Sequence, residues 1–232
     1  MKKIFIIHGW TYTTDKWNEF MEIIKSAGYE PVMLHVPGLT EETNKVWTLH
    51  AYVEWLKEKL VAEGQAVVIG HSNGGRIALA FAEKYPEKLK QLVLIDSAGI
   101  YQNGRAIRFK RFVFGAVAKF GKKITSSQLL RKIMYKLAGA KDYKNANVEM
   151  RQTMKNLILV DLKPHLSNIS IPTLIIWGAR DKATPLSDGQ LMHKLMPKSE
   201  LHIIPEAGHS PYFSHAKEVS KKIISFIKVN GF

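Results

Sequence analysis

The chain has no cysteine, which excludes disulfides, thiol nucleophiles and cysteine-ligated metal sites. It also lacks a long apolar segment near its start, because the apolar run at residues 4–7 ends at His8. That run is too short for a signal peptide, and a membrane span needs about twenty apolar residues. The absence of cysteine suits a reducing compartment, so we expect a cytoplasmic protein.

Acidic residues are scarce, since 20 Asp or Glu stand against 34 Lys or Arg and the formal net charge is +14. Most of the excess lies in residues 101–144, which contain twelve basic residues and one acidic residue. Such a segment is either an ordinary solvated basic face or a surface that attracts anionic lipid or an anionic substrate. No nucleic-acid partner is expected, because no nucleic-acid-binding motif accompanies the charge.

The 232 residues are enough for one domain with a sizeable core, and 46% of them are hydrophobic. Short apolar runs alternate with helical patterns. The runs predict strands at residues 3–7, 31–36, 66–69, 91–95, 173–177 and 201–204. The helical patterns lie at residues 15–27, 48–63, 75–84, 187–196 and 215–229. This alternation predicts an α/β fold with a mostly parallel sheet of about six strands, flanked by helices.

One stretch interrupts the alternation, because residues 101–168 read as helical with no clear strand. We interpret this stretch as a helical cap insertion over the carboxyl ends of the strands. The core domain then comprises residues 1–100 and 169–232. Within the predicted cap, residues 107–122 place phenylalanines on one helical face and basic residues largely on the other. We expect either ordinary packing of that helix or peripheral contact with an anionic membrane.

The most informative motif is Gly-x-Ser-x-Gly at residues 70–74, between an apolar strand and a helix. This spacing is that of a nucleophile elbow, a turn so sharp that the hydroxyl of Ser72 stands clear of the backbone. The glycines two residues before and after the serine approach each other, so a side chain at either would clash. Ser72 is therefore the predicted nucleophile.

A serine hydroxyl needs a general base, and the base needs an acid that orients it. His209 is the predicted base because it lies in a loop after the last strand, whereas His202 and His215 fall in a predicted strand and at a helix start. Asp181 is the predicted acid, four residues beyond the fifth strand. Asp96, directly after the fourth strand, remains the alternative. Asp188 is a weaker candidate, since it lies in the first turn of a predicted helix.

Backbone amides are expected to bind the oxyanion. The amide of Asn73 follows the nucleophile at the start of a helix. The second donor is expected from the loop after the first strand, where Gly9 lets the backbone bend and Trp10 offers its amide. His8, Gly9, Trp10 and His71 are the predicted pocket residues.

Taken together, these motifs resemble the α/β-hydrolase superfamily. The matching segments, in the right order, are residues 8–10, 70–75, 177–181 and 208–209. The resemblance implies that the first strand lies between the second and third, and that ligands bind where the strand order reverses. The chain lacks the antiparallel hairpin that many members carry before this first strand. Many members also carry a glycine-rich loop with a serine after the second strand, and residues 36–40 match that loop only loosely.

The resemblance implies that the dehalogenases and epoxide hydrolases of this superfamily have an aspartate nucleophile at the elbow. The serine at this position therefore argues against both activities. It favours hydrolysis of an ester or related acyl bond in a small hydrophobic substrate. The alternatives are hydrolysis of a carbon–carbon bond beside a ketone, and a non-catalytic binding protein on a hydrolase scaffold. No metal or organic cofactor is expected.

Overall fold

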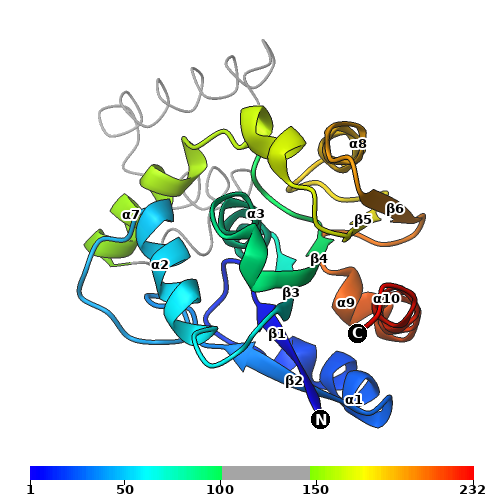
Figure 1. The fold of residues 1–232 in the computed structure, drawn as a ribbon. Helices are drawn as coiled ribbons and strands as arrows, with labels where there is room; N and C mark the ends of the chain where they lie inside the picture. The colour runs from blue at the N-terminus through cyan, green and yellow to red at the C-terminus, as the bar shows by residue number, and fades with distance from the viewer. Residues whose placement is uncertain (101–146) are drawn as a thin grey trace, which may run out of the picture.

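The computed structural model describes residues 1–100 and 147–232. Within them, six strands form one fully parallel sheet in the order β2-β1-β3-β4-β5-β6, as Figure 1 shows. The strands are β1 Lys2–Ile7, β2 Tyr29–Leu34, β3 Ala66–His71, β4 Leu89–Ile95, β5 Thr173–Gly178 and β6 Ser199–Ile204. The predicted six-stranded parallel sheet is confirmed, and β1 lies between β2 and β3 as the resemblance implied.

Helices cover both faces of this sheet (Figure 1). One face carries α2, α3 and α8, whose apolar side chains share a single buried cluster, and the other carries α1, α9 and α10. The bounds are α1 Asn18–Ser26, α2 Leu49–Lys59, α3 Asn73–Lys84, α8 Leu186–Leu195, α9 Pro211–Ser214 and α10 Ala216–Val229. Short 3-10 helices precede α1 and β4, namely η1 Asp15–Trp17 and η2 Pro86–Lys88.

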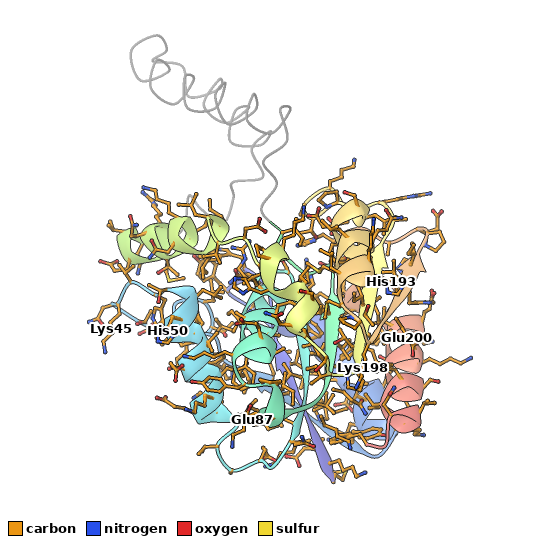
Figure 2. The ribbon with its side chains drawn as sticks, turned by 45° about the horizontal axis from the view of Figure 1, so that its top comes forward. Lys45, His50, Glu87, His193, Lys198 and Glu200 are labelled. Atoms are coloured by element: carbon orange, nitrogen blue, oxygen red, sulfur yellow. The ribbon has the colours of Figure 1, made fainter. Side chains whose placement is uncertain are left out.

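The central strands are buried on both faces, which explains their continuous apolar sequences. In β1, Ile4 and Ile6 enter one cluster, whereas Phe5 and Ile7 enter the other. Full burial of such a side chain contributes about 1.5–3 kcal/mol. Exposed charges lie on the surface of these layers and in the loops, as Lys45, Glu87 and Glu200 do in Figure 2. The sheet is therefore a rigid platform for the loops at its carboxyl edge.

Residues 147–168 pack onto this platform through helix α7 Val148–Ile158 and the 3-10 helix η3 Lys163–Asn168. Met150, Leu157 and Leu166 belong to the same buried cluster as α2 and α3. The amide of Trp47 also donates to the hydroxyl of Thr153 at 2.8 Å. Residues 101–146 of the predicted cap lie outside the described residues, so the domain boundaries stay a prediction. Among the residues that are described, no helix is long and apolar enough to span a membrane.

Two element bounds differ instructively from the sequence prediction. Strand β2 begins at Tyr29 rather than at residue 31, and Pro31 lies inside it, paired with Ile4. A proline is tolerated there because β2 is an edge strand whose outer side needs no donor. The predicted final helix is preceded by the separate short helix α9, and the two are divided at His215.

Candidate active site

Ser72 directly follows β3 and is the residue before the first turn of α3. Its backbone has φ 53° and ψ −117°, a conformation that costs a non-glycine residue about 1–3 kcal/mol. Hydrogen bonds to the end of β4 and to the loop after it hold Ser72: its amide donates to the carbonyl oxygen of Ile95 at 3.1 Å, and its carbonyl accepts from the amide of Ala98 at 2.9 Å. The strained turn presents the hydroxyl at the carboxyl edge of the sheet.

The glycines around Ser72 are required by close backbone contacts. A Cβ atom at Gly70 would lie 2.8 Å from the carbonyl oxygen of Gly74 and 2.7 Å from the Cα of Gly75. A Cβ atom at Gly74 would collide with the carbonyl oxygen of Ile7 in β1. The predicted steric role of these glycines is therefore confirmed, and α3 packs closely on β1 and β3.

The loops after β3, β5 and β6 bring three predicted residues together. The Oγ of Ser72 lies 2.9 Å from Nε2 of His209, and Nδ1 of His209 lies 2.7 Å from Oδ2 of Asp181. An ionised carboxylate only accepts hydrogen bonds, so Nδ1 carries the proton and Nε2 accepts from the serine hydroxyl. This is the tautomer in which His209 can remove the hydroxyl proton.

The carboxylate of Asp181 is fixed by four donors. Its Oδ1 accepts from the amides of Ala183 at 2.7 Å and Thr184 at 3.1 Å, and its Oδ2 accepts from the Thr184 hydroxyl and His209. Burial raises the pKa of Asp181, but the hydrogen bonds and charge of His209, with those of Thr184 and Ala183, outweigh burial and hold the pKa below its ordinary value. Asp181 therefore stays ionised beside the imidazole.

Sequence reasoning did not single out Thr184. Its hydroxyl lies 2.7 Å from Oδ2 of Asp181, 3.1 Å from the carbonyl oxygen of Asp96 and 3.3 Å from Nδ1 of His209. The available signal was the sequence Asp181-Lys182-Ala183-Thr184, because an aspartate often binds backbone amides two residues on. Thr184 therefore helps to hold the acid, because its hydroxyl and Nδ1 of His209 meet the same carboxylate oxygen of Asp181.

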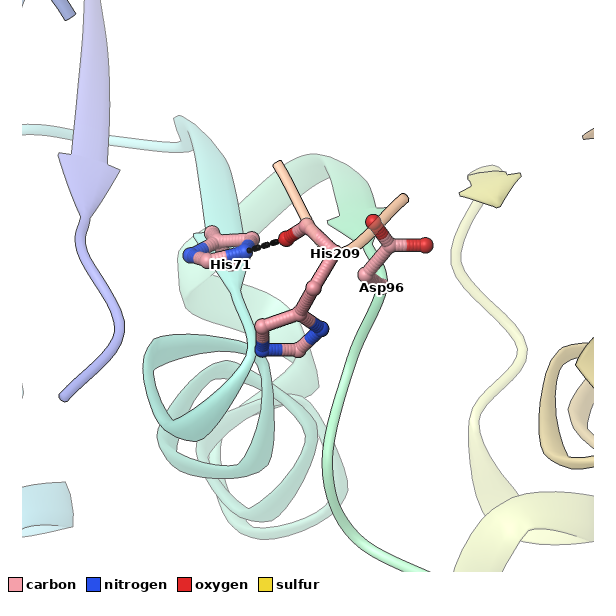
Figure 3. Close-up of side chains that lie close together, drawn as sticks. All are labelled: His71, Asp96 and His209. Atoms are coloured by element: carbon pink, nitrogen blue, oxygen red, sulfur yellow. Dashed lines mark hydrogen bonds between the residues drawn. The ribbon is translucent and has the colours of Figure 1, made fainter. Parts of the chain in front are cut away.

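Asp96, the alternative acid, is held away from this role by its backbone. It follows β4 with φ 42°, and its Oδ1 accepts from the amide of Gly178 at 2.8 Å. Its other oxygen is buried without a hydrogen-bond partner among the described residues. Burial raises the pKa of Asp96 to about 8, the Gly178 amide opposes that rise and the charge of Asp181 adds to it. Figure 3 shows its carboxylate near His209.

The free energy of unfolding should therefore depend on pH through Asp96. Between its ordinary pKa of 3.8 and about 8, the folded protein retains a proton that the unfolded chain has released. Stability should fall as pH rises through this window, by up to about 1.4 kcal/mol per pH unit, and Asp96→Asn should remove that slope. Urea unfolding of both proteins at pH 5, 6, 7 and 8 measures it. Parallel curves for the two proteins would contradict a neutral Asp96.

His71 holds the backbone of the predicted base, His209. Its Nε2–H donates to the carbonyl oxygen of His209 at 2.7 Å (Figure 3), and its ring packs edge-on against Tyr212 at 4.8 Å. Burial and the nearby charge of His209 lower the pKa of His71 to about 3, so the ring is neutral. It is only 5% exposed. Its predicted place in the pocket wall stays a prediction, but its hydrogen bond anchors the His209 loop.

The loop after β1 lies against the nucleophile. A Cβ atom at Gly9 would lie 2.9 Å from the Cβ of Ser72, so the backbone of Gly9 touches the elbow. Asn73 is the first residue of α3, and the first amides of a helix have no intrahelical acceptor. The amides of Asn73 and Trp10 are therefore placed on elements that border Ser72, while their role as oxyanion donors stays a prediction.

His8 holds the loop after β1 through two side-chain hydrogen bonds. It is fully buried, its Nδ1–H donates to the carbonyl oxygen of Gly9 at 2.8 Å, and its Nε2 accepts from the hydroxyl of Thr40 at 2.7 Å. The same hydroxyl accepts from the amide of Val36 at 3.0 Å. Because the Gly9 carbonyl can only accept, Nδ1 of His8 carries the proton and Nε2 is the acceptor. The loosely matching segment at residues 36–40 thus supports the loop after β1. The predicted pocket role of His8 stays a prediction.

An open groove of about 700 Å³ lies beside the triad rather than over it. Its lining residues come from the loops after β1 and β2 and from the residue before α7. They are Tyr12, Gly38, Leu39, Glu41, Glu42, Thr43, Asn44 and Asn147. The two glutamates make this groove negative, so an anionic group of a ligand is repelled from this side.

The nitrogens or oxygens of His71, Asp96 and His209 lie within 4.8 Å of one another and could in principle surround a metal ion. Both ring nitrogens of His209 are already within hydrogen-bond distance of Ser72 and Asp181, and Nε2 of His71 donates to a carbonyl. A metal would have to displace these bonds. The described geometry therefore favours a hydrogen-bonded cluster over a metal centre.

A parallel sheet with a serine elbow and a loop histidine at its carboxyl edge defines the α/β-hydrolase class. A family model described as alpha/beta hydrolase fold matches residues 3–216. The chain belongs to this family.

Similar curated proteins include a 2-hydroxy-6-oxononadienedioate/2-hydroxy-6-oxononatrienedioate hydrolase of Burkholderia vietnamiensis, 23% identical over 97% of this chain and 86% of that protein. A 2-hydroxy-6-oxo-6-phenylhexa-2,4-dienoate hydrolase of Burkholderia cepacia is 25% identical over 98% of this chain and 88% of that protein. Among solved structures, the α/β-hydrolase enzyme MGS-MChE2 from a lagoon sediment metagenome has a TM-score of 0.75 at 20% identity, covering 100% of this chain and 92% of that one.

Proposed function

We propose that this hydrolase cleaves an ester or related acyl bond of a small hydrophobic substrate through Ser72, His209 and Asp181. The observation that carries the proposal is the continuous path of hydrogen bonds from the Ser72 hydroxyl through both nitrogens of His209 to Asp181. The distances of 2.9 Å and 2.7 Å suit proton transfer, and the carboxylate, which only accepts, supports the tautomer with the proton on Nδ1.

The reaction begins when Oγ of Ser72 attacks the substrate carbonyl while Nε2 of His209 takes the hydroxyl proton. Asp181 stabilises the resulting imidazolium through the bond to Nδ1. Collapse of the tetrahedral intermediate breaks the ester bond, and His209 returns the proton to the leaving alkoxide oxygen. Water then attacks the acyl-enzyme with His209 as its base, which releases the acid and regenerates Ser72.

The amides of Asn73 and Trp10 are the proposed oxyanion donors. Asn73 lies at the positive end of the α3 dipole, which favours negative charge on the carbonyl oxygen in the transition state. One such donor is worth about 10²–10³ in rate. These residues supply nucleophile, base, acid and donors, so the proposed chemistry requires no metal or organic cofactor.

A second candidate is hydrolysis of a carbon–carbon bond beside a ketone. The names of the two Burkholderia relatives favour it, since both are 2-hydroxy-6-oxo-dienoate or dienedioate hydrolases and match this chain over nearly its whole length. The same serine, histidine and oxyanion donors could serve either reaction. A non-catalytic binding role is less well supported, because each position of the triad holds a competent residue in bonding distance.

Two measurements separate these candidates. A fluorophosphonate probe should label the folded wild-type protein and leave Ser72→Ala unlabelled, since it reacts only with an activated serine. A panel of p-nitrophenyl esters and 2-hydroxy-6-oxo-dienoates should then show ester turnover at the higher kcat/KM. Turnover of the dienoates alone would make the second candidate correct. Absence of both labelling and turnover would favour the binding role.

The predicted membrane contact of residues 107–122 lies outside the described residues and stays a proposal. Contact between this basic segment and an anionic membrane would bring the cap close to a hydrophobic substrate dissolved in that membrane. Co-sedimentation with anionic vesicles at low salt tests it, and the absence of binding would end it.

A further inference from the structure

Two polar side chains in the first turn of α3 are buried without a hydrogen-bond partner among the described residues. They are Nδ2 of Asn73 and Nε of Arg76. Asn73 is 8% exposed and Arg76 is 7% exposed. Both atoms are donors, and a buried donor left unpaired costs about 1–3 kcal/mol, more when the group is charged. The triad uses neither side chain.

Both residues lie in the turn that begins at the nucleophile, since Asn73 follows Ser72 and the amide of Arg76 donates to the carbonyl oxygen of Ser72 at 3.2 Å. Asn73 and Arg76 are three residues apart, so they lie on the same face of α3. Side chains in a helix lean towards its N-terminus, and the N-terminus of α3 begins at Ser72. The positive end of the helix dipole points the same way, which makes an anion favourable there and an unpaired cation costly.

None of the ion pairs among the described residues includes Arg76, so no described carboxylate serves as its counter-ion. Burial lowers the pKa of Arg76 to about 10, which still leaves a cation at neutral pH. An uncompensated buried charge is strongly destabilising. The only acidic residue in the sequence between residues 101 and 146 is Asp142, so the chain offers few ways to neutralise Arg76 from within.

We propose that Arg76 and Asn73 form an anion subsite beside Ser72, and that the substrate carries a carboxylate that this subsite binds. The inference rests on the proposed hydrolase function and specifies its substrate class. A guanidinium binds a carboxylate through two parallel N–H bonds, and the Asn73 amide supplies a further donor. The negative groove at Glu41 and Glu42 repels the same carboxylate. The two charged surfaces together orient the substrate across Ser72.

The test compares two esters that differ in one carboxylate, p-nitrophenyl butyrate and mono-p-nitrophenyl glutarate. The wild-type protein should prefer the glutarate ester. Arg76→Met should lower kcat/KM for the glutarate ester by about 10- to 100-fold, the worth of a hydrogen bond to a charged group, and change it for the butyrate ester by less than about threefold. Arg76→Lys should fall between. The matched control is Lys198→Met, which removes an exposed charge just before β6, at the opposite edge of the sheet.

A binding measurement separates this inference from the function on which it rests. Free glutarate should raise the Tm of the wild-type protein and of Lys198→Met, and leave that of Arg76→Met unchanged. If glutarate protects but neither ester is hydrolysed, the proposed function fails and the subsite stands. If both esters are hydrolysed equally well by wild type, or if Arg76→Met loses both equally, the subsite is wrong.

A purely structural role for Arg76 gives a different result. If Asp142 neutralised Arg76, then Arg76→Met and Asp142→Asn would each lower the Tm, and glutarate would protect neither wild type nor variants. That outcome would overturn the proposal. Under the proposal, Arg76→Met without ligand should be at least as stable as wild type, because it removes an unpaired buried cation. Arg76→Lys, which keeps the charge, provides the comparison if the methionine variant folds poorly.

Discussion

Replacing Ser72 by alanine is expected to lower kcat by on the order of 10⁶-fold, the loss seen when a nucleophilic serine is removed from a complete triad. The physical reason is that Oγ of Ser72, at 2.9 Å, is the hydroxyl that the described residues place within bonding distance of Nε2 of His209. Turnover of a p-nitrophenyl ester, measured with enough protein to detect residual activity, gives the ratio. A variant with full turnover would refute the assigned nucleophile.

The matching control is Ser72→Gly. Because Ser72 has φ 53° and ψ −117°, a region that glycine adopts easily, the glycine variant should be at least as stable as the alanine variant while equally inactive. Urea unfolding measures the difference. Equal inactivity with different stability would separate the chemistry of the hydroxyl from the strain of the turn.

Replacing Asp181 by asparagine is expected to lower kcat by about 10⁴-fold with little change in KM. Asparagine keeps the size of the side chain, but it cannot offset the charge of the imidazolium, and its amide can hold His209 in the wrong tautomer. Both oxygens of the Asp181 carboxylate accept hydrogen bonds from surrounding donors. The NH2 group of asparagine would therefore face a donor whichever oxygen it replaced. Steady-state kinetics with the preferred substrate test this expectation.

Asp96→Asn is the control for that experiment, because Asp96 is the other acid at the same edge of the sheet. Its Oδ1 accepts from the Gly178 amide, a bond that asparagine retains. The change should lower kcat by less than about tenfold, since it removes no charge that pairs with His209 at neutral pH. A larger loss in Asp96→Asn than in Asp181→Asn would reverse the assignment of the acid.

The elbow and the sheet could be predicted from the sequence because their causes are local. The apolar run at residues 66–69 lies in a strand buried on both faces, and the glycines after the run are required by backbone contacts within a few residues or with β1. The helices on both faces follow from the alternation of patterns. The elbow, the strands and the helices depend on hydrophobic periodicity and backbone sterics, and both can be inferred from a short segment of sequence.

The choice between Asp181 and Asp96 could not be made from the sequence alone. Both follow strands that end at the same edge, so order and spacing allow either. The structure distinguishes them through contacts made across the fold: Asp96 turns towards Gly178 with φ 42°, whereas Asp181 turns towards His209. The bond from His71 to the carbonyl of His209 joins residues 138 apart. No local pattern signals a contact of that kind.

The separation between the nucleophile and its base has a consequence for the time at which activity arises during synthesis. Ser72 and His209 are 137 residues apart, and the chain is made from its N-terminus. The proposed nucleophile, its elbow and the loop after β1 are therefore synthesised long before the proposed base. A nascent or truncated chain that ends before β6 has a serine without a proton acceptor. Under the proposed mechanism, the hydroxyl of Ser72 becomes reactive only when β6 has paired with β5 and the loop that carries His209 has formed.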